Sequence, residues 1–537
     1  MEKFRRNSVK KVLLVQPNIK WIDWNWKTSW DLHPYSICLL GAVIREDYDV
    51  QVVDAYIDDQ SPEDFKKAIA FHKPDLVGIT MLTNEYLGAA HIAAALVREV
   101  DPNITTVIGG VYATVSYKAI FEDSNFDYIC IGEGERVFPE LLGYLNGQSP
   151  FPSAGFLGRL DGEKTDPATV VRAPFIQDLD SLPWPAWDLV DYGRYIQDAG
   201  KITVDHPYTY PFTRLMTSRG CPIGCSFCEV ELISGGPFRF RSIENVIGEL
   251  KWLKAEYGIK AFMMDDDNFY IRRPRVLEFC NALIEENLDF EWKSHAVAVF
   301  HMNDDVIELM AQSGCTSINL AIESGSERVL KDIIHKPVKL DRARQVCAKI
   351  KEAGMDLIAN FIIGFPGETW EEIRQTFRFA SELPLDYAKF FIATPLEGTD
   401  LHAMVLESNL MIAQADSSGQ MLDLDWQTSN IYSEEWTTQD LTILRGYEWE
   451  RINFATPEKR KKLASMMNIS LEDLDKLRTD TFKSVSANIV KMSNLANMAG
   501  PSLTEHHGDH RAPGAISYPG VNLIPEASKQ APVSFGF

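Results

Sequence analysis

The sequence has no apolar run that approaches the length needed to span a bilayer. Residues 1–11 are basic, but the apolar run that follows them is only a few residues long, which does not match a secretory signal peptide. We therefore expect no transmembrane segment and a cytoplasmic location. At 537 residues the chain is long enough for roughly two to four domains.

The chain is also short of positive charge. It has 53 lysines and arginines against 76 aspartates and glutamates, which gives a formal net charge of −23. Binding to a nucleic-acid backbone requires clustered cations opposite the phosphates. We therefore expect no nucleic-acid partner.

Cysteine is scarce and mostly scattered. Five of the eight cysteines lie in apolar or mixed stretches, where buried reduced thiols are favoured over disulfides: Cys38, Cys130, Cys280, Cys315 and Cys347. The other three, Cys221, Cys225 and Cys228, have the spacing C-x3-C-x2-C. Three thiolates on one loop can hold three irons of a four-iron four-sulfur (4Fe-4S) cluster, and the fourth iron stays open to a small molecule.

Two other interpretations of this triad are a structural zinc site and buried free thiols. Zinc takes four ligands, usually arranged as two pairs. The sequence after Cys228 contains no companion pair. Gly220 and Gly224 allow the chain to curl around a cluster, because glycine adopts positive φ at little cost. The cluster is the favoured interpretation.

Short apolar runs alternate with helix-length segments near the start of the chain, which predicts a parallel sheet of βαβ units. The expected order is flavodoxin-like, with a ligand at the carboxyl ends of the strands. The five runs are residues 12–15, 50–53, 76–79, 106–108 and 128–131.

Six further strand-like runs between residues 213 and 400 predict a partial (β/α)6 TIM-like barrel, with its chemistry at the carboxyl ends of the strands. One of its helices is predicted over residues 243–257, where an apolar stripe ends at Gly258. The class is thus α/β. The predicted domains are 1–140 (Rossmann-type), 141–205 (connector), 206–400 (barrel), 401–500 (helical) and 501–537 (a disordered tail).

The order of an α/β domain, a cysteine loop and a barrel resembles the cobalamin-dependent radical S-adenosylmethionine (radical SAM) enzymes, and in particular their class B methyltransferases. The resemblance implies a cobalamin-binding first domain and a radical SAM barrel with a 4Fe-4S cluster at Cys221, Cys225 and Cys228. It also implies methylation of an unactivated carbon of a small-molecule substrate, through a 5′-deoxyadenosyl radical and methylcobalamin. The electron would come from an external donor such as flavodoxin or ferredoxin.

The resemblance also carries cofactor contacts, residue by residue. Asp266, Asp267 and Asn268 would lie near the amino group of SAM, although such residues also cap helices. Glu323 and Ser324 would face its ribose and carboxylate, and a buried acid such as Glu323 is costly unless it is paired. The adenine would lie beside Phe227 and Gly364. The expected cobalamin contacts are Thr80, Leu82, Gly109, Gly110, Gly132 and Glu133.

His33 belongs to Asp31-Leu32-His33-Pro34-Tyr35-Ser36, a near match to the Asp-x-His-x-x-Gly motif that supplies a histidine to cobalt in other cobalamin domains. Ser36 replaces the glycine, and the resemblance implies cobalt without a histidine ligand. We interpret His33 as a pocket or structural residue. No catalytic residue and no substrate identity can be assigned at this level. A cyclase or rearrangement enzyme without methyl transfer, and a non-catalytic cobalamin sensor, are the alternative functions.

Overall fold

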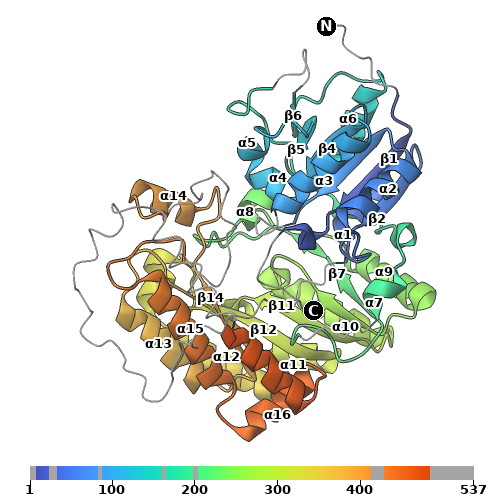
Figure 1. The fold of residues 1–537 in the computed structure, drawn as a ribbon. Coiled ribbons are helices and arrows are strands. Elements are labelled where there is room, and N and C mark those ends of the chain that lie inside the picture. Colours follow the sequence, from blue (N-terminus) through green and yellow to red (C-terminus); the bar gives the residue numbers. More distant parts are fainter. Residues whose placement is uncertain are drawn as a thin grey trace.

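The computed structural model describes residues 8–22, 33–82, 87–159, 165–197, 203–412 and 429–483. These residues form two α/β units, each built on a largely parallel six-stranded sheet (Figure 1). The predicted tail, residues 501–537, lies outside the described residues. No helix in the described ranges is both long enough and apolar enough to cross a membrane.

The first sheet has the strand order β2-β1-β3-β4-β5-β6. Its strands are β1 (Lys11–Gln16), β2 (Asp49–Asp54), β3 (Leu76–Thr80), β4 (Thr105–Gly109), β5 (Tyr128–Cys130) and β6 (Phe156–Gly158). Its helices are α1 (Tyr35–Ile44), α2 (Pro62–His72), α3 (Leu87–Val100), α4 (Val111–Val115), α5 (Tyr117–Ile120) and α6 (Gly134–Leu145), with a 3-10 turn η1 (Ile19–Trp21).

The first five strands are parallel and follow the flavodoxin-like order, as predicted. β6 was not predicted. It adds antiparallel to β5, with Leu157 opposite Ile129. Three residues that end in Gly158 are too short to show an alternating pattern, so only the neighbouring strand defines this one.

The second sheet has the order β14-β13-β12-β11-β10-β7, and all its pairs are parallel. The strands are β7 (Phe212–Leu215), β10 (Ala261–Met264), β11 (Glu291–Val297), β12 (Cys315–Glu323), β13 (Asp356–Ile363) and β14 (Tyr387–Ile392). β8 (Ser218–Arg219) and β9 (Arg239–Phe240) form a separate antiparallel pair.

Helices follow the strands of the second unit: α8 (Val230–Ile233), α9 (Ile243–Tyr257), α10 (Arg273–Glu285), α11 (Asp304–Gln312), α12 (Leu340–Glu352) and α13 (Trp370–Glu382). Short turns are η5 (Phe269–Ile271), η6 (Val299–His301) and the π-helix η7 (Val329–Ile333). α9 begins at the side-chain cap of Ser242 and ends at Gly258, which has φ +66°. The prediction for this helix is confirmed.

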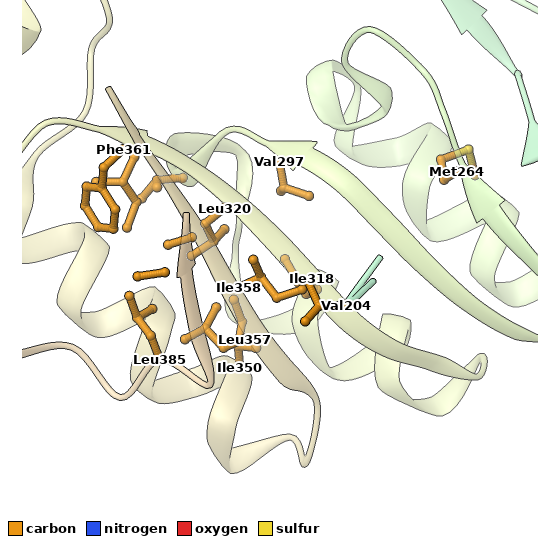
Figure 2. Close-up of a cluster of buried hydrophobic side chains, with 14 of the residues drawn as sticks. Val204, Met264, Val297, Ile318, Leu320, Ile350, Leu357, Ile358, Phe361 and Leu385 are labelled. Atoms are coloured by element: carbon orange, nitrogen blue, oxygen red, sulfur yellow. The ribbon is translucent and has the colours of Figure 1, made fainter. Parts of the chain in front are cut away.

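A large apolar core lies between the second sheet and its helices (Figure 2). Ile318, Leu320, Leu357 and Phe361 are fully buried there. Because side chains alternate along a strand, Asn319 on β12 and Ile358 and Asn360 on β13 lie on the opposite face of the sheet. We call that opposite face the inner face.

The connector holds η3 (Leu179–Ser181), η4 (Trp187–Leu189) and α7 (Gly193–Ile196). Its end, residues 203–210, runs past the inner face. Asp205 forms an ion pair with Lys389 on β14, with Nζ to oxygen distances of 2.6 and 2.7 Å, and Lys293 on β11 donates to the carbonyl of Val204 at 3.3 Å. The connector therefore ties together distant strands of the second sheet.

The C-terminal region is helical where it is described, as predicted, with α14 (Asp400–Glu407), α15 (Thr438–Asn453) and α16 (Pro457–Met466). α15 covers the outer edge of β14. Asn453 accepts from the amide of Ala388 and donates to its carbonyl, both at 2.8 Å. These bonds satisfy a strand edge that would otherwise be unpaired.

Candidate functional site

The three clustered cysteines lie on a loop whose ends are joined by a short ladder. We call residues 220–238 the cysteine loop. β8 precedes it, β9 follows it, and Arg219 pairs with Arg239 across the ladder. Gly220 has φ +93°, and a Cβ there would lie 2.4 Å from the carbonyl oxygen of Pro237, so glycine is required for this turn.

Backbone hydrogen bonds hold the cysteine loop from several sides. The amide of Gly220 donates to Asp267 Oδ2 at 2.8 Å. The amide of Ser226 donates to the carbonyl of Ile334 at 3.0 Å, and its carbonyl accepts from the amide of Leu401 at 2.8 Å. The backbone of the cysteine loop is therefore held by residues from several other elements of the second unit.

The cysteine thiols fit a cluster better than a single metal ion. Burial raises the pKa of Cys225 to about 11 and that of Cys228 to about 12, and coordination would remove these protons. In the described part of the chain, no three His, Cys, Asp or Glu side chains are arranged to hold one metal ion. A cubane gives each thiolate its own iron, so the thiols need not converge on one point.

Asp266, Asp267 and Asn268 follow β10 and lie at or beside the start of the cysteine loop, and their contact with the SAM amino group stays a prediction. Asp266 accepts from the amide of Thr217 at 2.5 Å and from the Ser218 hydroxyl at 2.6 Å, and Asp267 accepts from Gly220. Both carboxylates therefore position the chain around the loop. Asn268 differs: its Nδ2 lies 3.6 Å from Cys221 Sγ, and its buried Oδ1 has no partner. Asn268 is the member of this trio with an acceptor left for a ligand.

Glu323, at the end of β12, forms a buried ion pair with Lys336. Glu323 Oε1 lies 2.7 Å from Lys336 Nζ, and both residues are 5% exposed. Burial lowers the pKa of Lys336, but Glu323 and the nearby Cys225 and Cys228 outweigh it and raise that pKa overall. Lys336 thus places a cation beside the cysteine loop. Lys336 was not predicted, because a lysine in an ordinary local pattern carries no sign of burial.

Ser324 and Gly364 lie in neighbouring turns after β12 and β13. The Ser324 hydroxyl is 3.2 Å from Thr376 Oγ1 and accepts from the amide of Ser326, so it holds its own turn. Gly364 has φ +85°. Phe227 of the cysteine loop lies near Phe365, with ring centroids 6.1 Å apart. The structure thus brings Phe227 and the Gly364 turn together, and their contact with adenine stays a prediction.

Glu368 makes the stability of this turn dependent on pH. Its Oε2 accepts from the amides of Gly364 and Phe365 at 2.7 and 3.1 Å. Burial raises its pKa from 4.5 to about 8. The folded state therefore keeps the proton to higher pH than the unfolded state. The contribution of Glu368 to stability is full below pH 4.5 and is lost as the pH rises to about 8.

We expect Glu368→Gln to remove this part of the pH dependence. The difference in unfolding free energy between wild type and variant should change by at most about 5 kcal/mol across the window, measured by urea unfolding at several pH values. Glu372→Gln is the control, because Arg328 holds the pKa of Glu372 down to about 2, so its effect should change only at lower pH. A flat difference for Glu368→Gln would contradict the assignment.

The carboxyl ends of β3, β4 and β5 gather the predicted cobalamin contacts. Thr80 is the last residue of β3 and Leu82 lies just beyond it, while Gly109 is the last residue of β4 and Gly110 follows it. A Cβ on Gly110 would lie 2.6 Å from the carbonyl oxygen of Met81, so the turn requires glycine. At Gly132, beyond β5, a Cβ would meet no atom within 4 Å. This edge can therefore receive a flat ligand close to its backbone.

Glu133, the remaining predicted cobalamin contact, forms ion pairs with two arginines. Its carboxylate lies 3.0 Å from Arg219 Nη1 and 2.8 Å from Arg239 Nη1, the two residues that flank the cysteine loop. Its side chain is only 8% exposed. Glu133 therefore links the first unit to the cysteine loop.

His33 is enclosed by aromatic rings of the connector and of β7. Its ring centroid is 5.5 to 6.2 Å from four rings: Trp187, Tyr192, Tyr195 and Phe212. Its Nε2 is 3.1 Å from the carbonyl oxygen of Tyr195, and the residue is 3% exposed. These contacts give His33 a packing role between the connector and β7.

We expect no nitrogen from His33 on cobalt. Electron paramagnetic resonance (EPR) of the protein with cob(II)alamin should therefore give the same nitrogen superhyperfine pattern in wild type and in His33→Ala. The variant should bind cobalamin but unfold at lower temperature, because removing the ring leaves a cavity. A nitrogen splitting that is present in wild type and vanishes in His33→Ala would make His33 the axial ligand.

The inner face of the second sheet is polar, which the sequence analysis did not predict. It carries the ion pair of Arg214 and Asp265, at 2.6 Å, and that of Lys389 and Asp205. Asn319 on β12 and Asn360 on β13 each bury an Oδ1 atom that has no partner. Unpaired buried acceptors are rare in folded proteins, so this face suits a polar ligand.

The comparisons with known proteins match both units. The Radical SAM superfamily matches residues 215–380 and the B12 binding domain matches residues 27–142. An uncharacterized methyltransferase of Pyrococcus horikoshii is 33% identical over 380 residues, which are 71% of this chain and 80% of the relative. The chain belongs to the cobalamin-dependent radical SAM family.

A second relative is the cytidylyl-2-hydroxyethylphosphonate methyltransferase of Streptomyces wedmorensis, which is 32% identical over 401 residues, covering 68% of this chain and 74% of the relative. Two solved structures share the fold. TsrM from Kitasatospora setae has a TM-score of 0.62 at 18% identity, covering 78% of this chain and 80% of that chain. OxsB has a TM-score of 0.65 at 15% identity, covering 91% and 75%.

Membership in the cobalamin-dependent radical SAM family gives the cofactor set: a 4Fe-4S cluster, SAM and cobalamin. We expect the cysteine loop to hold the cluster and the carboxyl edge of the first sheet, which we call the cobalamin edge, to hold cobalamin. Asn268, Glu323 and Lys336 lie around the cysteine loop, where SAM would reach the open iron.

Proposed function

We propose that this protein is a cobalamin-dependent radical SAM methyltransferase that methylates an unactivated carbon of a small polar molecule. The observation that carries the proposal is the ion-paired contact of Glu133 with Arg219. Glu133 directly follows Gly132 at the cobalamin edge, and Arg219 lies two positions before Cys221, so this contact joins the two regions. The cobalamin edge and the cysteine loop thus belong to one site.

When bound, the cluster and cobalamin supply reductive cleavage of SAM and methyl transfer, which amino-acid side chains cannot perform. The protein holds and orients the reactants. Cys221, Cys225 and Cys228 would hold the cluster, and Glu323 with Lys336 would bind polar groups of SAM. The inner face, with Asn319 and Asn360, would orient the substrate by hydrogen bonds. Such positioning can account for a large part of an enzyme's rate enhancement.

Relatives named as methyltransferases support methyl transfer, whereas other relatives, 27% identical, are named anaerobic magnesium-protoporphyrin IX monomethyl ester cyclases. SAM labelled in its methyl group separates the two functions. We expect the label to reach a metabolite that accumulates unmethylated in a deletion strain. Formation of 5′-deoxyadenosine with no label in any product would favour the cyclase.

The cobalamin-sensor alternative makes a different prediction, because sensing requires no cluster. Iron and sulfide assays after anaerobic reconstitution should find a 4Fe-4S cluster. A protein that bound corrin but neither iron nor sulfide would support the sensor.

We further propose an external one-electron donor such as flavodoxin or ferredoxin, no nucleic-acid partner and a location in the cytoplasm. None of the eight cysteines, all of which lie in the described ranges, forms a disulfide, which suits a reducing compartment. To test the donor, reduced flavodoxin is mixed with the reconstituted protein. We expect the visible absorbance of the cluster to decrease as the cluster is reduced.

A further inference from the structure

Glu133 lies at the centre of a buried ion-pair network between the two units. Its Oε1 is 3.0 Å from Arg219 Nη1, and its two oxygens are 2.8 and 3.0 Å from Arg239 Nη1. Its Oε2 accepts from the amide of Ile176 in the connector at 2.6 Å. Arg219 Nη2 reaches Glu135 at 2.6 Å. One carboxylate thus joins the first sheet, the connector and both ends of the cysteine loop.

The two arginines are paired by the fold. They are direct neighbours in the β8–β9 ladder, which closes the cysteine loop. Arg239 also donates to the carbonyls of Ile176 and Ser234, both at 2.6 Å. Any shift of Glu133 therefore moves the two strands that set where the loop begins and ends.

The network is buried and its formal charges balance. The side chains of Glu133, Glu135, Arg219 and Arg239 are 8, 12, 14 and 4% exposed. Removal of one carboxylate would leave a buried guanidinium without compensation, which is much costlier than the loss of an exposed pair.

A second contact joins the same two parts. Arg172 of the connector donates to the carbonyl of Leu232 in α8 and, at 3.1 Å, to the carbonyl of Thr114 in α4. α8 begins two residues after Cys228, and α4 follows β4 at the cobalamin edge. Figure 1 shows α8 beside α4. The cysteine loop is thus held against the first unit at both of its halves.

We propose that Glu133 is a positioning residue: with Arg219 and Arg239 it fixes the cluster relative to the cobalamin edge and balances the charge next to the cluster. The inference rests on the cofactor set of the proposed function. Two consequences follow. The cluster–cobalt distance depends on Glu133, and the cluster potential shifts in opposite directions when the carboxylate or a guanidinium is neutralised.

The distance can be measured because the reduced cluster and cob(II)alamin are both paramagnetic. Pulsed EPR of the reconstituted full-length protein should give one narrow cluster–cobalt distance. We expect Glu133→Gln to broaden that distribution, because the amide places a donor where the carboxylate accepts from the arginines and from Ile176. Arg239→Lys keeps the positive charge but has fewer hydrogen-bond donors, so it should also broaden the distance distribution. This variant replaces Glu133→Gln in the test if Glu133→Gln fails to bind the cluster or cobalamin.

Arg98→Met is the matched control. Arg98 forms a buried pair with Asp127 inside the first unit, with Nη2 to Oδ2 at 2.8 Å, and has no bond to the cysteine loop in the described structure. The cluster–cobalt distance distribution of Arg98→Met should equal that of wild type. Distributions unchanged in Glu133→Gln and Arg239→Lys would overturn the positioning role.

The reduction potential of the cluster is measured by redox titration, with the EPR signal of the reduced cluster as the readout. Glu133→Gln removes a negative charge and should raise the cluster potential, because net positive charge nearby favours the reduced cluster. Arg239→Met should lower it. Shifts of the same sign, or no shifts, would refute the charge role. Failure of wild type to bind cluster or corrin would instead refute the proposed function.

Discussion

Replacing Cys221, Cys225 or Cys228 by alanine is expected to abolish cleavage of SAM to 5′-deoxyadenosine. Each thiolate would hold one iron of the cluster, and two thiolates on a loop are too few to retain it. We expect a loss of more than about 100-fold, since even partners outside the ligand shell of a metal contribute about 10- to 100-fold. Anaerobic reconstitution followed by iron, sulfide and 5′-deoxyadenosine assays gives the measurement.

The controls are Cys280→Ala and Cys347→Ala. Both cysteines are fully buried in the core between the second sheet and its helices, away from the cysteine loop. They should keep wild-type iron and sulfide content and lose only some stability. The cluster-loop variants should remain folded, because the loop backbone is held by Asp267, Ile334 and Leu401 rather than by the thiols. Full SAM cleavage in any of the three would refute the cluster site.

Glu323→Gln is expected to destabilise the barrel and to weaken SAM binding together. The substitution leaves the Lys336 ammonium buried without its carboxylate, and breaking such a pair costs about 3–5 kcal/mol. Denaturant unfolding of the protein without cofactors measures the first effect. Calorimetric titration of the reconstituted protein with SAM measures the second.

A double variant separates these two roles. Glu323→Leu with Lys336→Met replaces the pair by apolar side chains of similar size, which is often neutral or stabilising. We expect it to recover most of the stability of the single variant but not the affinity for SAM. Recovery of both would show that the pair has only a structural role, and SAM would then need other polar contacts.

Local patterns in the sequence were enough to predict most of the strands and to indicate the loop that is expected to hold the cluster. Runs such as Val12–Val15 are apolar because both faces of a parallel strand are buried, so they are visible without knowledge of their neighbours. The triad Cys221, Cys225 and Cys228 is equally local, because one loop supplies all the protein ligands. β6 escaped prediction because three residues that end in Gly158 become a strand only by pairing with β5.

Residues whose partners lie far away in the sequence could not be recognised from local patterns. Glu133 and Arg219 are 86 positions apart, and nothing around either of them indicates the other. Lys336, Asn319 and Asn360 are ordinary residues in ordinary patterns. What distinguishes them is burial and an unusual set of neighbours, and both arise only when distant strands come together.

The sequence by itself therefore determined the chemistry that a short segment can encode: the cluster loop, the βαβ alternation and the glycines at strand ends. Only the tertiary structure decided how that chemistry is held. It showed that Asp266 and Asp267 support the loop, left Asn268 with an unpaired acceptor, and gave Glu133 ion pairs that link the two units. The reason is that the energy of a charge depends on its distance to other charges and on its exposure to water, and neither is fixed until the chain has folded.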